Sequence, residues 1–194
     1  MFRSTSYATL LLLLLMQSTQ AASLVVNSNN IVTGASGVSV NGILYDVAIG
    51  DGTCVSLFNG CDQPADFPFT SSSETSDALN ALFSLISQSP YQQSPTSFSG
   101  CVSPVICALA TPYSLAQGFA TLNILFIFGS SLPNNISDDV LSPSSNTADI
   151  RTISYVRWTT QKVNPVPEPN ALMLLGIGLL SQRWLRTRGK RVPV

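Results

Sequence analysis

The 194-residue sequence contains no histidine, and only 10% of its residues carry a charge. The absence of histidine excludes Ser-His-Asp and Cys-His catalysis, histidine-ligated zinc and the commonest general base. Lys162 is the only lysine outside the C-terminal tail, and it lies in the stretch that runs into a linker, which makes Ser-Lys catalysis a formal possibility only. We therefore expect a protein that is not an enzyme.

Cations are scarce in the central part of the chain. Residues 22–165 hold nine acidic and three basic residues, a net charge of 3 − 9 = −6, whereas the whole chain has a formal charge of −1. No cluster of cations is present there to displace phosphate counterions, so nucleic acid is not an expected partner. Abundant Ser, Thr, Asn and Gln with little Lys is typical of exported proteins that live among polysaccharide.

The N-terminus has the pattern of a secretory signal peptide, which we assign to residues 1–21. One positive charge at Arg3 precedes an apolar run from Ala8 to Met16, and polar residues follow before Ala21. Thr19 and Ala21 are the small residues that signal peptidase accepts before its cut. We predict cleavage after Ala21, with Ala22 as the neighbouring alternative.

The C-terminus has three parts in a fixed order. A Val166-Pro167-Glu168-Pro169 box comes first, and the apolar run Ala171–Leu180 follows it. The third part is a basic tail with five cations: Arg183, Arg186, Arg188, Lys190 and Arg191. This order resembles the PEP-CTERM sorting tail of exported bacterial proteins. The resemblance implies recognition and processing by exosortase, a membrane enzyme, in a Gram-negative bacterium.

The apolar part of this tail, residues 164–194, is short for a membrane span. The run of 10 apolar residues is interrupted at Ser181–Arg183. Extending it to Leu185 gives about 22 Å of helix against about 30 Å of hydrocarbon. The basic tail predicts a cytoplasmic end, which leaves the Pro-Glu-Pro box on the outer face of the membrane. We expect a short transmembrane helix that anchors the protein transiently.

The four cysteines form two close pairs in the sequence. Cys54 and Cys61 are seven residues apart, and Cys101 and Cys107 are six apart. Four cysteines allow three pairings, and we favour the local one in an exported protein. Zinc is the alternative, but neither gap is the two to four residues usual for a zinc site, and exported thiols tend to oxidise.

Carboxylates near glycine-rich turns are the remaining chemical candidates: Asp46, Asp51, Asp62 and Asp66. A pair of them could act on a glycosidic bond, and the same group could bind calcium. No EF-hand or nonapeptide pattern is present, so we interpret them as solvated turn residues. We expect no metal site and no cofactor.

Residues 22–163 are long enough for one exported domain, and their patterns predict an α+β fold that is mostly antiparallel sheet with one helix. Asn41-Gly42 between two β-prone runs, residues 38–49, predicts a hairpin. Helical spacing runs to about Gln88 behind a cap at Ser73 or Ser76. Strands are predicted at 118–128 and 151–160, and loops at 54–68, 89–112 and 130–149.

Two classes of function remain. The first is a structural or adhesive component of the cell envelope or extracellular matrix, since the resemblance links such tails to exopolysaccharide and biofilm production. The second is a glycan-acting enzyme at the cell surface that uses the acidic residues. The placement of the four aspartates discriminates between them, because an enzyme needs two carboxyl groups that face each other across a cleft.

Overall fold

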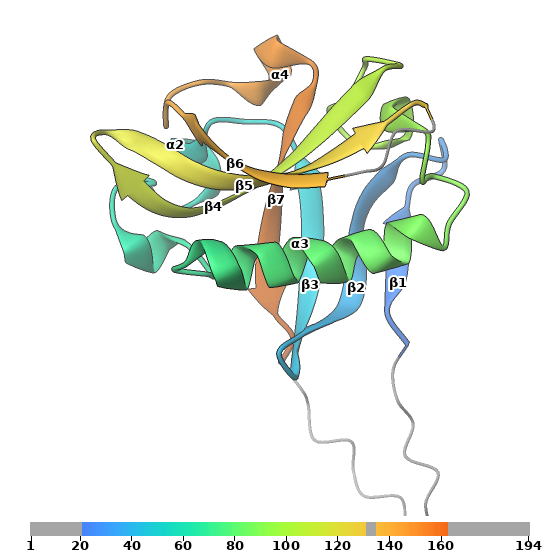
Figure 1. Ribbon diagram of the computed structural model, residues 1–194, viewed down its shortest axis with the longest axis horizontal. Coiled ribbons are helices and arrows are strands. Elements are labelled where there is room, and N and C mark those ends of the chain that lie inside the picture. Colours follow the sequence, from blue (N-terminus) through green and yellow to red (C-terminus); the bar gives the residue numbers. More distant parts are fainter. Residues whose placement is uncertain (1–20, 131–134, 163–194) are drawn as a thin grey trace, which may run out of the picture. The chain divides into compact units, whose positions relative to one another are not determined.

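The computed structural model describes residues 21–130 and 135–162; residues 1–20 of the predicted signal peptide and the predicted sorting tail lie outside these ranges. The described residues form one seven-stranded sheet in the order β1-β2-β3-β7-β4-β5-β6, with a long helix, α3, across one face (Figure 1). The strands are β1 Ser23–Val26, β2 Val32–Val40, β3 Ile43–Gly50, β4 Ile106–Ala116, β5 Phe119–Phe128, β6 Asn135–Leu141 and β7 Ile153–Thr160.

The sheet is mixed rather than wholly antiparallel. Five neighbouring pairs are antiparallel, and β4 and β7 run parallel through Ala108–Ala110 and Ile153–Tyr155. The α+β class is therefore confirmed for the described residues. The parallel pair joins the hairpins of the first half of the domain to the β4-β5-β6 meander.

The hairpin predicted from Asn41-Gly42 is present. β2 and β3 pair up to Val40↔Ile43, and the two turn residues have φ of 50° and 83°. Positive φ at both central residues is what a two-residue hairpin turn with the right-handed twist of its strands requires. A Cβ placed on Gly42 would meet no atom within 4 Å, so the tip of this turn is open.

The predicted helix is α3, Ser72–Ser87, and it begins slightly earlier than the sequence suggested. Its N-cap is Ser71, whose side chain accepts a hydrogen bond from the backbone N–H of Glu74, so the assignment to Ser73 or Ser76 was wrong. Glu74 in the first turn accepts from the backbone N–H of Thr70. The apolar face of the helix, led by Leu79, Leu82 and Ile86, is buried on the sheet.

Alternating strand residues divide the interior between the two faces of the sheet. On β4, Leu109 packs in the core under α3, whereas Ala108 and Ala110 pack in a second core. Val156 and Tyr155 on β7 divide in the same way, as expected for a period of two. The second core is covered by residues of the disulfide loop, including Cys54, Phe58, Cys61 and Phe67.

Three predicted loops contain regular structure. The segment 54–68 holds the short helix α2, Cys54–Leu57, and the 3₁₀ turn η1, Pro64–Asp66. The segment 89–112 holds η2, Pro95–Ser97, and the first half of β4. The segment 130–149 holds β6 and the start of α4, Thr147–Ile150. β1 and the first half of β2 were also missed.

The described ranges contain no helix long and apolar enough to cross a membrane. The predicted membrane helix lies in residues 164–194, outside those ranges.

Candidate functional site

The chain enters and leaves the domain at one place. Ser23, at the start of β1, is the register partner of Ser36. Gln161, directly after β7, donates from Nε2 to Ser36 Oγ at 3.2 Å and to Asp46 Oδ1 at 2.6 Å. We call Ser36, Asp46 and Gln161 the exit cluster. Figure 1 shows the start of β1 and the end of β7 at the same end of the sheet, near the β2-β3 turn.

Asp46 is the charged centre of the exit cluster. Its Oδ1 also accepts from Ser36 Oγ at 2.7 Å and from the Gly37 backbone N–H at 3.4 Å. Hydrogen bonds from Ser36 and Gln161 lower the pKa of Asp46 below its usual value. The carboxylate therefore stays ionised at neutral pH and holds the last residue before the linker against the sheet.

Asp51 joins three segments at the opposite end of β3. Its Oδ1 accepts from Thr147 Oγ1 at 3.0 Å and from Ser154 Oγ at 3.1 Å, which ties α4 and β7 to the end of β3. Gly100, with φ of 84°, passes so close that a Cβ there would clash with Asp51 and Ser154. The role of Asp51 in these contacts is to hold loops together.

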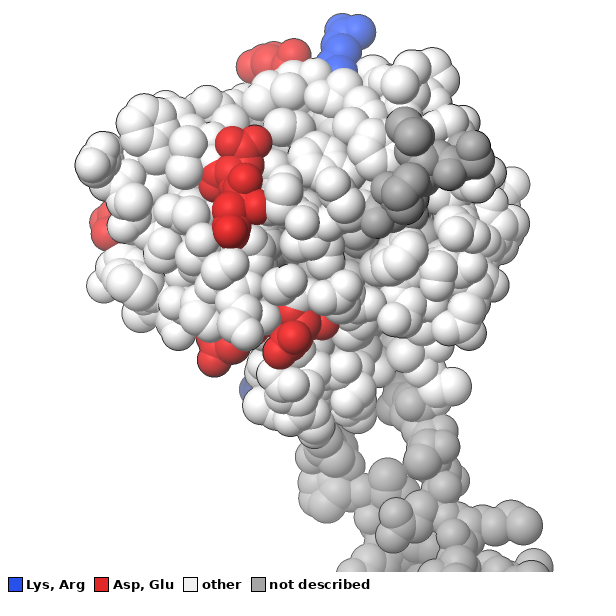
Figure 2. Space-filling view, viewed as in Figure 1, with Lys and Arg blue, Asp and Glu red and all other residues white. Residues whose placement is uncertain are grey.

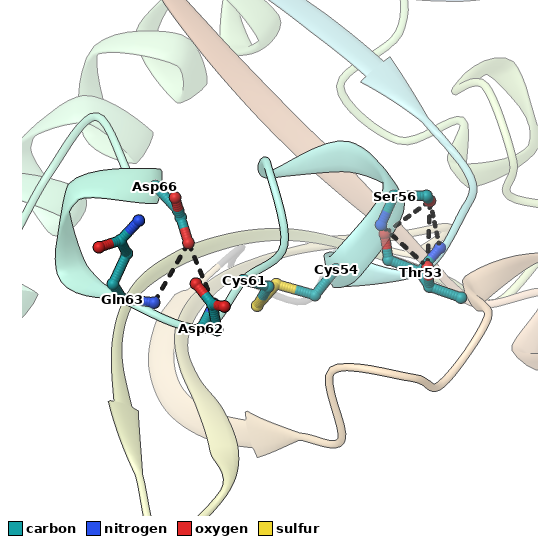
Figure 3. The surroundings of a disulfide bond; sticks show 7 residues. All are labelled: Thr53, Cys54, Ser56, Cys61, Asp62, Gln63 and Asp66. Carbon is teal, nitrogen blue, oxygen red and sulfur yellow. Dashed lines mark hydrogen bonds between the residues drawn. A yellow bond between two sulfur atoms is a disulfide. The ribbon is translucent and has the colours of Figure 1, made fainter.

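Asp66 organises the loop that carries the first disulfide (Figure 3). Its Oδ2 accepts from the backbone N–H of Asp62 at 3.0 Å and of Gln63 at 3.1 Å. The Asp62 hydrogen bond is the main cause of the lowered pKa of Asp66. Thr53 caps α2 by accepting from the Ser56 backbone N–H at 3.1 Å. The loop is thus fixed at both ends by side-chain caps.

The predicted disulfide pairing is confirmed. Cys54 is bonded to Cys61, and Cys101 to Cys107, each pair with a Cα–Cα distance of 5.6 Å. All four cysteines are buried. Within the described residues, no group of three or more histidine, cysteine, aspartate or glutamate side chains could hold a metal ion.

A buried amide fixes the start of α3 over the sheet. Asn123 on β5 is 2% exposed, and its Nδ2 donates to the Ser72 carbonyl at 2.6 Å. Ser72 Oγ donates to Asp138 on β6 at 3.0 Å, and the Tyr113 hydroxyl on β4 donates to the same carboxylate at 3.3 Å. Burial, followed by the charge of Asp138, raises the pKa of Tyr113. These hydrogen bonds hold the start of α3 against β5 and β6, and they give the polar groups of the cluster hydrogen-bond partners.

Acidic side chains form separate spots on the face of the molecule shown in Figure 2, and few cations are visible there. The four candidate aspartates follow the same pattern. Asp46 lies on β3 and binds Ser36 and Gln161, and Asp51 binds Thr147 and Ser154. Asp62 precedes η1, and Asp66 is its last residue. The structure therefore brings Asp62 and Asp66 together in one loop and gives Asp46 and Asp51 different partners.

The sequence did not indicate the partners of these aspartates. Ser36 and Gln161 are 125 residues apart, and Asp51 and Ser154 are 103 apart. Single polar residues at such separations give no local pattern.

Comparison of the whole chain with family models gives one result that bears on function. The model described as the PEP-CTERM protein-sorting motif matches residues 165–191. The chain carries a PEP-CTERM sorting motif. The matched range includes the Val166–Pro169 box and all five predicted tail cations. Searches of curated proteins and of solved structures gave no match.

The PEP-CTERM motif implies an exported protein that is transiently anchored in a membrane and processed by exosortase. The individual roles of Glu168 and of the tail cations stay predictions, since these residues lie outside the described ranges. The predicted signal-peptide cut after Ala21 also stays a prediction. That cut would leave β1, which begins at Ser23, complete.

Proposed function

We propose that this protein is a non-catalytic structural or adhesive component of the cell envelope or extracellular matrix, sorted by exosortase and associated with exopolysaccharide. The observation that carries the proposal is the PEP-CTERM motif at residues 165–191, directly after a folded domain that ends its last strand at Thr160. The motif directs export and sorting, and the disulfide-bonded domain is the part of the protein that reaches the cell surface.

The chemistry of the domain supports a role without catalysis. Asp46, Asp51 and Asp66 each accept two or more hydrogen bonds from their own surroundings. A glycosidase needs two carboxyl groups that flank the scissile bond, one as general acid and the other as general base or nucleophile, which is a different use of the group. We therefore favour binding or structural roles over the glycan-acting enzyme.

The two disulfides fit an extracellular destination. Each disulfide joins two cysteines that are six or seven residues apart in the sequence, and each lies in one of the two cores. Disulfides persist in oxidising compartments and stabilise domains outside the cell. The acidic, lysine-poor surface suits a hydrated polysaccharide environment better than a polyanionic partner.

The sorting part of the proposal is tested by changing Glu168 to Ala in a strain that contains exosortase. The box lies outside the described residues, and the sequence predicts that it is extended, because proline fixes φ near −65° and disfavours helix at the residue before it; Glu168 supplies its single charge. We expect the Glu168→Ala protein to remain unprocessed in the membrane fraction, and deletion of residues 183–191 to cause the same failure or mislocalisation. Maturation of the Glu168→Ala protein to the cell surface at the wild-type level would contradict the proposal.

A further inference from the structure

The last residue of the domain is held by both its main chain and its side chain. The backbone N–H of Gln161 donates to the Leu44 carbonyl at 2.8 Å, and its side chain joins the exit cluster. The folded domain therefore extends to Gln161, and any free reach of the chain toward the Pro-Glu-Pro box is counted from this residue.

Five residues, 162–166, separate Gln161 from Pro167. Six steps of fully extended chain span at most about 20 Å. This reach is shorter than the length of β7, whose eight residues extend over about 26 Å. Whatever grips the Pro-Glu-Pro box must therefore come close to the end of the folded domain from which the chain leaves.

We propose that this exit end, formed by the exit cluster and the Asn41-Gly42 turn, faces exosortase at close range while the tail is processed. The inference rests on the proposed function, because it takes exosortase as the processing enzyme. Beyond the proposed function, it specifies which end of the domain faces the enzyme. It also specifies the largest separation of the two, which is limited by the length of residues 162–166.

The exit end suits a close approach. Asn41 and Gly42 in its turn are exposed, and a Cβ at Gly42 would meet no atom within 4 Å. Ile43 beside the turn is 51% exposed. At the other end of β7, the loop closed by Cys101–Cys107 exposes Val102 and Val105. The Val102 backbone N–H donates to the Arg151 carbonyl, and the Val105 carbonyl accepts from the Gly129 N–H. Each end of the sheet therefore has an exposed apolar side chain, so the two ends can be compared by the same kind of substitution.

Shortening the linker tests the distance. Deleting residues 162–164 leaves the matched motif intact and cuts the reach from Gln161 to the proline from about 20 Å to about 10 Å. The matched control replaces the same three residues with Gly-Ser-Gly. In cells with exosortase, we expect tail removal to be at least about tenfold slower in the deletion variant, and within about twofold of wild type in the control. Tail removal is measured by intact mass spectrometry.

A second pair of variants tests the surface. Ile43→Glu adds a charge at the exit end, and Val105→Glu adds one to the 68% exposed residue at the far end. We expect Ile43→Glu to slow tail removal at least about threefold and Val105→Glu to leave it unchanged. Cooperative urea unfolding at the wild-type midpoint establishes that each variant is folded.

The outcomes separate the two proposals. If Glu168→Ala blocks processing but the deletion variant is processed like wild type, the close approach is wrong and exosortase sorting stands. If the Ile43→Glu and Val105→Glu variants are processed at equal rates, the exit end is not the facing surface. If Glu168→Ala is itself processed normally, the proposed function fails first.

Discussion

Tyr155 carries a hydroxyl group into an apolar core. The side chain is fully buried on β7 in the second core, where its ring lies 5.5 Å from that of Phe58 in an edge-on arrangement. The hydroxyl has no hydrogen-bond partner among the described residues. Burial raises the pKa of Tyr155 to about 12. An unpaired buried hydroxyl lowers stability, so the ring must be retained for its packing.

We predict that Tyr155→Phe raises the free energy of unfolding at neutral pH by about 1 kcal/mol, because it removes the unpaired hydroxyl and keeps the ring. The folded-state pKa is raised above the unfolded value of about 10, so the contribution of Tyr155 to stability is present below pH 10 and is lost as the pH rises toward 12. The advantage of the variant should therefore grow over this window. Urea unfolding at several pH values measures it.

The half-buried Tyr91 supplies the control for this prediction. Tyr91→Phe removes a hydroxyl outside the second core. It should change the stability by less than about 0.5 kcal/mol at neutral pH. A Tyr155→Phe protein that is less stable than wild type would show that the hydroxyl has a partner in solution.

At the scale of the element, the sequence predicted the structure where local chemistry decides it. Asn41-Gly42 defined a turn, the spacing of Leu79, Leu82 and Ile86 defined a helix, and the apolar run of β5 defined a buried strand. Each of these signals lies within a few residues of chain. The same holds for the disulfides, whose partners are neighbours in the sequence.

The missed strands depend on distant partners. β4 contains Pro112, which lacks an N–H and sits where the β4-β5 register shifts between Pro112 and Ser114. β6 is polar and carries Asp138 and Asp139, and it forms the edge of the sheet beside β5. In β2, Gly37 has φ of 71° at a second register shift, between Ala35 and Val38. Pairing with neighbours overrides weak local preference at all three.

The Cys54–Cys61 disulfide, in the loop that covers the second core, is predicted to stabilise the folded domain. The double variant Cys54→Ser, Cys61→Ser should lose about 2.5 kcal/mol of stability, because the unfolded chain regains the freedom of the closed ring. The loss should exceed this value if Phe58 and Phe67 also leave the core. Chemical unfolding of the variant and of wild type measures the difference, and equal stability would show that the caps at Thr53 and Asp66 hold the loop without the bond.

At the scale of the whole molecule, both chain connections of the domain lie at one end. The signal-peptide side begins at β1 beside Ser36, and the sorting side leaves at Gln161, which binds the same serine. No sequence pattern predicted that the two connections lie together, because the contact between Gln161 and Ser36 depends on the pairing of β2 with β3 and of β3 with β7. Because both connections leave the same end of the domain, the domain can stay folded while the signal peptide or the sorting tail is processed at the membrane.

We expect the protein to be exported and trimmed at both ends. Intact mass spectrometry of the protein isolated from the envelope of a strain with exosortase tests it most directly. We predict one mature species that begins at Ala22 or Ser23, ends near Asn170 and has all four cysteines oxidised. A strain without exosortase should retain the tail. A protein in the wild-type envelope that still begins at Met1 and ends at Val194, with free thiols, would contradict the account.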